Sequence, residues 1–248
     1  MRIDLNADVG EGFEDEALLR IVTSVNIACG GHAGDAESMR RTVEAAHRFH
    51  LALGAHPGYP DRADFGRTPL DLSPDEIEHA VRDQVLALAR IAALQGKNLG
   101  HVKPHGALYN QAARDPALAR AIALGIWDID SGLRLVGLAG SALLEAGREV
   151  GLEVLAETFA DRRYLADGSL APRSIQGAVV TDPWFAAAQA VAIACGDRIS
   201  GLDGTWITVR AETIGIHGDT PDALLIARTV REALEVGGVR ILAPESLA

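Results

Sequence analysis

Short apolar runs alternate with longer amphipathic stretches along the chain. Runs of four to six residues with apolar or period-two character predict β-strands. These predicted strands cover residues 3–6, 25–28, 51–55, 99–103, 133–138, 152–157, 206–209 and 213–216, and residues 239–242 are a further candidate.

Helical periodicity fills the intervals between these runs. In residues 75–95, apolar side chains from Ile77 to Ile91 recur near helical spacing, which predicts an amphipathic helix. Ser73 followed by Pro74 is a typical start for it, since serine caps a helix and proline suits the first helical position. Further helices are predicted at residues 117–126, 141–150 and 223–236.

Strands that alternate with helices indicate a parallel sheet with right-handed crossovers. With about eight such units and no linker, the pattern favours a single α/β domain over residues 1–248. We predict a parallel (β/α) barrel, closed or nearly closed, and an open doubly wound sheet is the alternative. Residues 160–178 are rich in Arg, Asp, Gly and Pro, and a loop of that length is typically functional or disordered.

Composition narrows the class of protein. The chain has 34 acidic and 23 basic residues, a formal charge of −11, which argues against a nucleic-acid partner because phosphate binding needs a basic face. No apolar run approaches the roughly 20 residues of a membrane helix. With two cysteines, Cys29 and Cys195, and no signal peptide in the first residues, the expected compartment is the cytoplasm.

The polar chemistry concentrates at the ends of the predicted strands. His32, His56, His105 and His217 each stand beside glycine or proline at such an end, whereas the first strand ends in acidic residues. Parallel α/β folds bind ligands at the carboxyl ends of their strands. We therefore expect these side chains to meet at one mouth.

Period-two geometry places Asp4, Asn6 and Asp8 on one side of the first strand, and His101, Lys103 and His105 on one side of another. Simpler interpretations remain open for single residues. A lone strand-end histidine is more often structural, and Asp4 could merely hold the barrel together. Asp35 fits a helix start as well as a catalytic role.

Cys29 is expected to be a buried structural thiol rather than a nucleophile. The sequence contains no nucleotide P-loop, no G-x-G-x-x-G fingerprint, no H-E-x-x-H motif and no G-x-S-x-G elbow. Acid–base or metal-assisted hydrolysis by His, Asp, Glu and Lys is the chemistry that remains.

These motifs resemble the lactam-utilisation family, whose members are also known as the A-type subunits of 5-oxoprolinase. The resemblance covers nearly the whole chain in order, and its most specific block is residues 101–110, His-Val-Lys-Pro-His-Gly-Ala-Leu-Tyr-Asn. Other matching segments are residues 4–11, 26–35, 54–57, 159–162, 168–173 and 217–219. Thr68 and Gly215 depart from the pattern expected of many members.

The resemblance implies an α/β-barrel hydrolase of the glycoside hydrolase/deacetylase type. It implies a subunit of ATP-dependent 5-oxoprolinase, which opens the lactam of 5-oxoproline to give L-glutamate together with two partner subunits. ATP would then be a co-substrate of the complex, and the absence of a P-loop suits a partner that handles the nucleotide.

The expected catalytic residues are Asp8, His32, His56, Lys103, His105, Glu157 and His217. Glu157 is expected to orient a histidine or act as a second base. The expected substrate-binding residues are Asn6, Asn26, Arg67, Asn110, Asp161, Arg162 and Arg173. Arg162 and Arg173 lie in the long loop, which we expect to fold over the barrel mouth, where each planar guanidinium suits a carboxylate or phosphate.

Two other functions stay open from the sequence. One is a stand-alone metal-dependent deacetylase or amidase, since His and Asp ligands from several strands suit a divalent ion. The other is a non-catalytic subunit that holds a small carboxylate ligand. Whether a metal is bound, and where ATP binds, is left open by the sequence.

Overall fold

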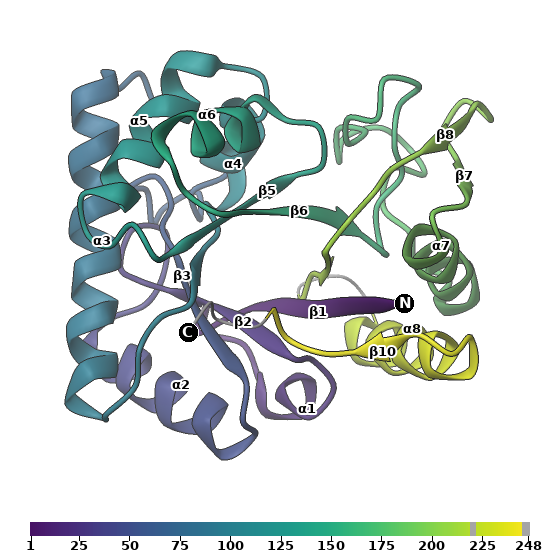
Figure 1. The fold of residues 1–248 in the computed structure, drawn as a ribbon, viewed down its shortest axis with the longest axis horizontal. Coiled ribbons are helices and arrows are strands. Elements are labelled where there is room, and N and C mark those ends of the chain that lie inside the picture. Colours follow the sequence, from purple (N-terminus) through teal and green to yellow (C-terminus); the bar gives the residue numbers. More distant parts are fainter. Residues whose placement is uncertain (219–221, 245–248) are drawn as a thin grey trace.

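The computed structural model describes residues 1–218 and 222–244, and its centre is a closed barrel of parallel strands (Figure 1). β1 closes the ring, because Asn6 to Val9 pair with β2 and Asp4 to Ala7 pair with β9. The barrel, rather than the open sheet, is therefore confirmed. In order around the ring its seven strands are β1 (Arg2–Val9), β2 (Ser24–Ala28), β3 (Ala52–His56), β4 (His101–Val102), β5 (Arg134–Leu138), β6 (Val154–Phe159) and β9 (Thr213–Ile216).

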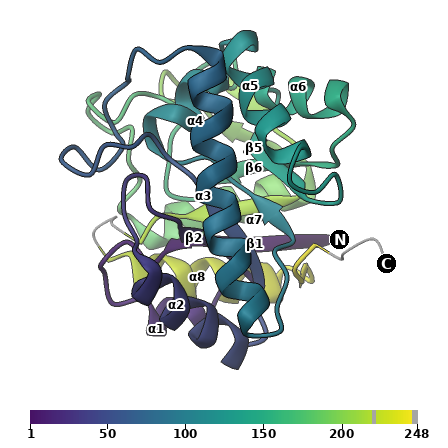
Figure 2. The same cartoon turned by 90° about the vertical axis from the view of Figure 1, so that its left-hand side faces the viewer.

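Helices surround the ring, and the longest, α3, runs along its outside (Figure 2). The α3 helix begins as predicted, with Ser73 accepting a hydrogen bond from the backbone of Glu76 and Pro74 in the first turn. The helices are α1 (Glu16–Leu19), α2 (Ala36–Arg48), α3 (Pro74–Leu94), α4 (Gly106–Ala112), α5 (Pro116–Trp127), α6 (Ala142–Val150), α7 (Pro183–Cys195) and α8 (Ala223–Val236). None of these described helices is long and apolar enough to cross a membrane.

The apolar core lies between the barrel and the helices. Outward residues of the strands, such as Leu5, Ile27 and Val102, are fully buried in it. Inward positions of the same strands include buried polar residues such as Asn6, Asn26 and His101. This division follows from the alternation of side chains across a strand, and it leaves the inside of the barrel for the site.

The prediction for residues 206–209 was wrong in its placement. They form β8 (Trp206–Thr208), which pairs with β7 (Arg198–Ser200) in an antiparallel hairpin outside the barrel. Trp206 and Thr208 are exposed and only Ile207 is buried, whereas every residue of β9 is buried. The barrel thus has seven strands rather than about eight. The candidate strand at residues 239–242 is present as the shorter β10 (Arg240–Ile241), which pairs with Arg2 and Ile3.

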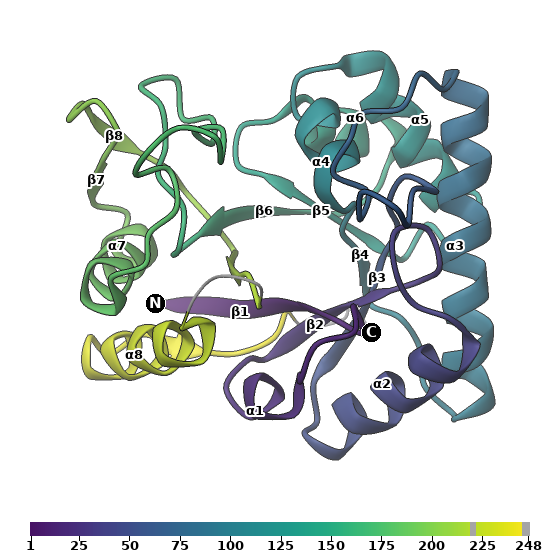
Figure 3. The ribbon, with the colours of Figure 1, turned by 180° about the vertical axis from the view of Figure 1, so that it is seen from behind.

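Residues 160–178 follow β6 and remain irregular apart from two bridges, Arg162 with Val179 and Tyr164 with Leu170. The buried hydroxyl of Tyr164 accepts a hydrogen bond from the backbone N–H of Phe159 at 2.7 Å. This contact packs the loop against the end of β6, on the side of the hairpin and α7 (Figure 3).

Candidate active site

Asp4 lies deepest of the three inward side chains of β1. Its carboxylate accepts hydrogen bonds from the hydroxyls of Thr23, Ser24 and Thr213 at 2.5 to 2.7 Å. Burial raises its pKa, although these three hydroxyls act against the rise. Asp4 therefore links β1 to its two neighbouring strands, β2 and β9. This is the structural role that the sequence left open.

Asn6 and Asn26 form the next layer, and both are buried. Asn26 Nδ2 donates to Asn6 Oδ1 and to Asp8 Oδ1, each at 2.8 Å. Asn6 Nδ2 in turn donates to Glu157 Oε1 at 2.9 Å. The two amides, which the sequence assigned to substrate binding, thus hold the carboxylates of Asp8 and Glu157 in place from below.

His101 completes this layer. Its Nε2 lies 2.9 Å from Asn26 Oδ1, so the ring donates to the amide oxygen. Burial is the main cause that lowers the pKa of His101 to about 3, and the charges of Lys103 and Arg134 contribute to the shift. The ring fits only because position 54 is glycine: a Cβ there would lie 2.1 Å from His101 Nε2.

Lys103 lies at the centre of the barrel mouth. Its Nζ is 3.0 Å from Asp8 Oδ1 and 2.8 Å from Glu157 Oε1. Burial lowers the pKa of Lys103, but the two carboxylates outweigh burial and raise it above its ordinary value. Burial likewise raises the pKa of Asp8, and the charges of His56 and Lys103 outweigh it and hold that pKa well below its ordinary value. Lys103 is therefore a buried, permanently charged ammonium.

Tyr109 was not predicted as a site residue. Its hydroxyl donates to Glu157 Oε2 at 2.8 Å, and burial raises its pKa well above the ordinary value, as does the charge of Glu157. Glu157 thus contacts Lys103, Asn6 and Tyr109. Among its described contacts, the residue that Glu157 orients is a lysine rather than a histidine. Tyr109 stands one helical turn after His105, a spacing that could have indicated it.

Three of the predicted histidines meet beside Asp8. His56 Nδ1 lies 2.7 Å from the carbonyl oxygen of Lys103, and His105 Nε2 lies 2.9 Å from that of Phe65. The remaining ring nitrogens, His56 Nε2 and His105 Nδ1, are 3.0 Å apart. His32 stacks on His105 with ring centroids 3.6 Å apart. Burial lowers the pKa of His32 to about 3 and that of His105 to about 2.

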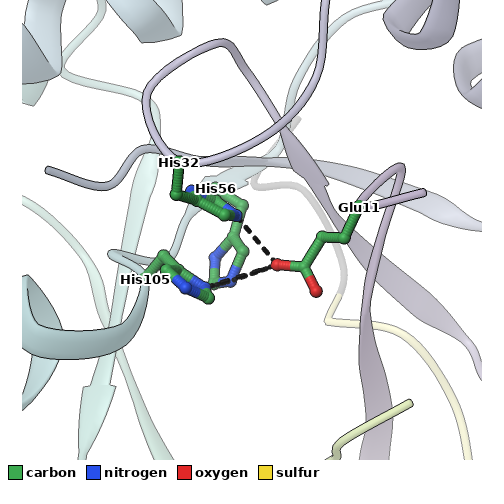
Figure 4. Close-up of side chains that lie close together, drawn as sticks. All are labelled: Glu11, His32, His56 and His105. Carbon is green, nitrogen blue, oxygen red and sulfur yellow. Dashed lines mark hydrogen bonds and ion pairs between the residues drawn. The ribbon is translucent and has the colours of Figure 1, made fainter. Parts of the chain in front are cut away.

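Glu11 joins this group and was missed as a candidate. Its Oε1 is 2.8 Å from His32 Nε2, 3.3 Å from His105 Nδ1 and 3.9 Å from His56 Nε2, and Figure 4 shows its carboxylate pointing at the rings. One donor atom from each of these four residues lies within 4.8 Å of the others. The signal for Glu11 was its place after Gly10, whose φ of +74° turns the chain back over the barrel mouth.

His217 is held separately, by Asp161. The backbone N–H of His217 donates to Asp161 Oδ2 at 3.2 Å, and its Nδ1 lies 3.0 Å from Oδ1. The ring also stacks on Phe159, with centroids 4.8 Å apart. Asp161, assigned to substrate binding from the sequence, therefore orients His217. The matching segment continues to Asp219, which lies outside the described residues.

A cavity of about 710 Å³ opens over these groups. Asp8, His56, Lys103, His105 and His217 line it, and so do the predicted binding residues Arg67, Asn110, Arg162 and Arg173. The loop 160–178 thus contributes one wall of the cavity. Arg162 is buried and donates to the carbonyl oxygen of Ala171 at 2.6 Å, whereas Arg173 is exposed. His32 and Glu157 are not among the residues that line the cavity. His32 contacts the lining residue His105, and Glu157 contacts the lining residue Lys103.

Two further residues that the sequence raised as possible catalytic groups have structural roles. Cys29 is buried, and burial raises its thiol pKa to about 12, so it is no thiolate at neutral pH. Asp35 is the N-cap of α2, with its carboxylate accepting from the backbone N–H of Ser38.

Comparison with known proteins adds to this geometry. A family model described as the LamB/YcsF family matches residues 3–248. The crystal structure of a lactam utilization protein from Thermus thermophilus superposes with a TM-score of 0.94 at 44% sequence identity, covering 98% of this chain and 100% of that one.

Two distantly related structures resemble this chain less closely. A protein from Enterococcus faecalis V583 with a proposed role in cellobiose-phosphate cleavage gives a TM-score of 0.56 at 15% identity, covering 100% of this chain and 98% of that one. A family 4 carbohydrate esterase from Streptomyces lividans gives 0.49 at 10% identity, with coverage of 97% and 91%. The Enterococcus likeness concerns the fold and says nothing about activity.

Proposed function

Because this chain belongs to the LamB/YcsF family, we propose that it is the subunit of an ATP-dependent 5-oxoprolinase that opens the lactam of 5-oxoproline to L-glutamate. The observation that carries the proposal is Lys103. Its ammonium is buried between Asp8 and Glu157 and faces the cavity. A fixed positive charge in such a place is suited to stabilise an oxyanion.

The cavity suits the substrate in size and polarity. Its volume of about 710 Å³ lies within the range of small-molecule sites. Arg67 and Arg173 also line the cavity, and a guanidinium pairs well with the substrate carboxylate. With the carboxylate bound by an arginine, the lactam ring would occupy the same cavity as Lys103.

Each polar group on the floor then has a proposed role. Lys103 stabilises the negative charge that develops on the lactam oxygen, or on a phosphorylated form of it. Asp8 and a histidine exchange protons with water and with the lactam nitrogen. We assign the delivery of that proton to His217, which lines the cavity and is held by Asp161. Glu157 and Tyr109 act on Lys103 by fixing its position.

ATP and two partner subunits complete the proposal. A five-membered lactam resists ring opening, so coupling to ATP is chemically sensible, and the partners would supply the nucleotide chemistry. The test is 5-oxoproline turnover by the purified chain, alone and reconstituted with the two partners, with and without ATP. We expect turnover only in the complete, ATP-containing mixture. Full ATP-coupled turnover by the single chain would refute the division of labour.

The group of Glu11 with three histidines favours one other activity, hydrolysis of acyclic amides by the chain alone with a divalent ion. The same preparation tests it on N-acetylated sugars without partners or ATP. Turnover there, together with none on 5-oxoproline in the complete mixture, would favour the deacetylase.

A further inference from the structure

The structure brings four potential metal ligands together at the edge of the cavity. We propose that His32, His56, His105 and Glu11 bind one divalent transition-metal ion, of which zinc is the best fit. The inference concerns binding and does not rest on the proposed function.

The hydrogen bonds of two rings show which nitrogens carry protons. A carbonyl oxygen only accepts, so His56 bears a proton on Nδ1, which faces the Lys103 carbonyl, and His105 bears one on Nε2, which faces the Phe65 carbonyl. In the neutral rings, His56 Nε2 and His105 Nδ1 therefore present lone pairs to each other at 3.0 Å. Two lone pairs at that distance repel, and a positive charge between them removes the repulsion.

The same two hydrogen bonds are those that metal-binding histidines make. A ligating imidazole usually donates its other N–H to a carbonyl or carboxylate, which fixes the ring and its tautomer. His56 and His105 both do so through the backbone. The backbone thus aims both lone pairs at one point.

The spacing of the donor atoms distinguishes a metal from a shared proton. A proton bridges two atoms, whereas Glu11 Oε1 and His32 Nε2 also converge here, 2.8 Å apart. Tetrahedral zinc with bonds of about 2.0–2.1 Å places its ligands roughly 3.3 Å apart. The contacts of Glu11 Oε1 with the three rings measure 2.8, 3.3 and 3.9 Å, which bracket that value.

Charge balance favours a divalent ion. Asp8, Glu11 and Glu157 contribute three carboxylates to this group of contacting side chains, and Lys103 contributes one ammonium. An imidazole that ligates a metal is neutral, so in the metal-bound state these side chains are short of two positive charges. Arg62 and Arg67, which also act on His32, are exposed and screened by solvent. One M²⁺ ion would neutralise the buried charge.

The donor set selects the class of metal. Three imidazole nitrogens and one carboxylate oxygen suit zinc, cobalt or nickel, whereas magnesium and calcium require oxygen ligands. Because His56 and His105 line the cavity, the ion would lie at its edge, within reach of a bound substrate or water.

The test is zinc titration of the chelator-treated full-length chain by calorimetry, with circular dichroism to confirm folding. We expect one tight zinc per chain, no competing magnesium binding, and a visible cobalt spectrum typical of tetrahedral coordination. Glu11→Gln keeps the side-chain shape but weakens the ligand, and His105→Asn removes one. Since loss of a supporting hydrogen bond alone costs about 10–100-fold in metal affinity, each variant should bind zinc at least about 100-fold more weakly.

His47→Asn is the matched control, because His47 lies near His50 on the exposed surface of α2, where zinc could bind adventitiously. It should bind zinc as wild type does. Zinc affinity lost in His47→Asn, or kept in His105→Asn, would overturn the proposal. If a variant fails to fold, anomalous diffraction from zinc-soaked wild-type crystals decides: a peak between the four side chains supports the site, and a peak elsewhere or none refutes it. Tight zinc without 5-oxoproline turnover would count against the proposed function alone.

Discussion

Gly215 lies directly against Glu157: a Cβ at position 215 would stand 2.7 Å from Glu157 Oε1. That oxygen is the one that lies 2.8 Å from Lys103 Nζ and accepts from Asn6 at 2.9 Å. The missing side chain of β9 therefore makes the space in which the carboxylate of β6 holds the lysine.

Replacing Gly215 by alanine should accordingly impair turnover more than stability. The added methyl group displaces the Glu157 carboxylate and, through it, Lys103. A displacement of about 1 Å in a catalytic group can cost on the order of 100-fold in rate, while overpacking costs about 1–3 kcal/mol of unfolding free energy. Steady-state turnover of the reconstituted complex and urea unfolding measure the two effects.

Gly100→Ala is the control for this change, since a Cβ at position 100 meets only the carbonyl oxygen of Leu53 at 3.8 Å. It should leave turnover near the wild-type level. A Gly215→Ala variant with normal turnover would show that the position of Glu157 does not matter to the reaction.

The sequence predicted the barrel and the convergence of its polar residues because both follow from local patterns. Alternation placed Asp4, Asn6 and Asp8 inside, and parallel topology gathered the strand-end histidines at one mouth. Trp206 to Val209 misled the prediction because a short alternating segment looks the same in a barrel and in a hairpin.

What escaped prediction depends on contacts between distant segments. Glu11 and Tyr109 become part of the site only where the chain folds back after β1 and β4. Gly10 and the one-turn spacing from His105 are local hints, and neither shows which distant side chains these two residues contact. Likewise, sequence could not separate the supporting amides Asn6 and Asn26 from groups that line the cavity. It also gave no hint that Lys103 is enclosed by two carboxylates.

The enclosure of Lys103 predicts that its loss is costly for folding as well as for turnover. Lys103→Met would leave Asp8 and Glu157 buried without their counter-charge, and breaking a buried ion pair costs about 3–5 kcal/mol. We expect turnover to be abolished and the urea midpoint to fall. Adding Glu157→Gln should recover part of the stability, since it removes one uncompensated charge, and none of the turnover.

Lys97→Met is the matched control, because Lys97 is the only other lysine of the chain and follows α3 away from the cavity. The Lys97→Met variant should change neither turnover nor the urea midpoint. A Lys103→Met variant that keeps turnover would contradict the oxyanion role.

Arg173 should act on substrate binding rather than on the chemical step. It is exposed at the cavity wall, and a hydrogen bond to a charged group contributes about 1.5–3 kcal/mol. Arg173→Gln should therefore raise the KM for 5-oxoproline by roughly 10–100-fold with kcat little changed. Arg198→Gln, which removes a guanidinium stacked on Trp206 outside the cavity, should leave KM unaltered. An unchanged KM in Arg173→Gln would exclude Arg173 from carboxylate binding.

Asp15 predicts a specific dependence of stability on pH. Its carboxylate accepts from the backbone N–H of Gly10 at 2.8 Å. Its pKa is raised to about 6, chiefly by burial and also by the charges of Glu11 and Glu14. In the unfolded chain the pKa is about 3.9. A raised pKa means that the folded state prefers the protonated acid, so this stabilisation is complete below about pH 4 and is lost as the pH rises towards 6.

Asp15→Asn should remove that loss, because the amide oxygen still accepts from Gly10 and cannot ionise. We expect wild type and variant to unfold alike near pH 4, and the variant to be more stable near pH 7 by on the order of 2 kcal/mol. Urea unfolding in chelator-containing buffers between those pH values measures the difference. Asp35→Asn should behave oppositely, since hydrogen bonds from Ser38 lower the pKa of Asp35 and its stabilisation is present at neutral pH and lost on acidification. Parallel pH profiles for wild type and Asp15→Asn would show that the carboxylate of Asp15 titrates normally in the folded chain.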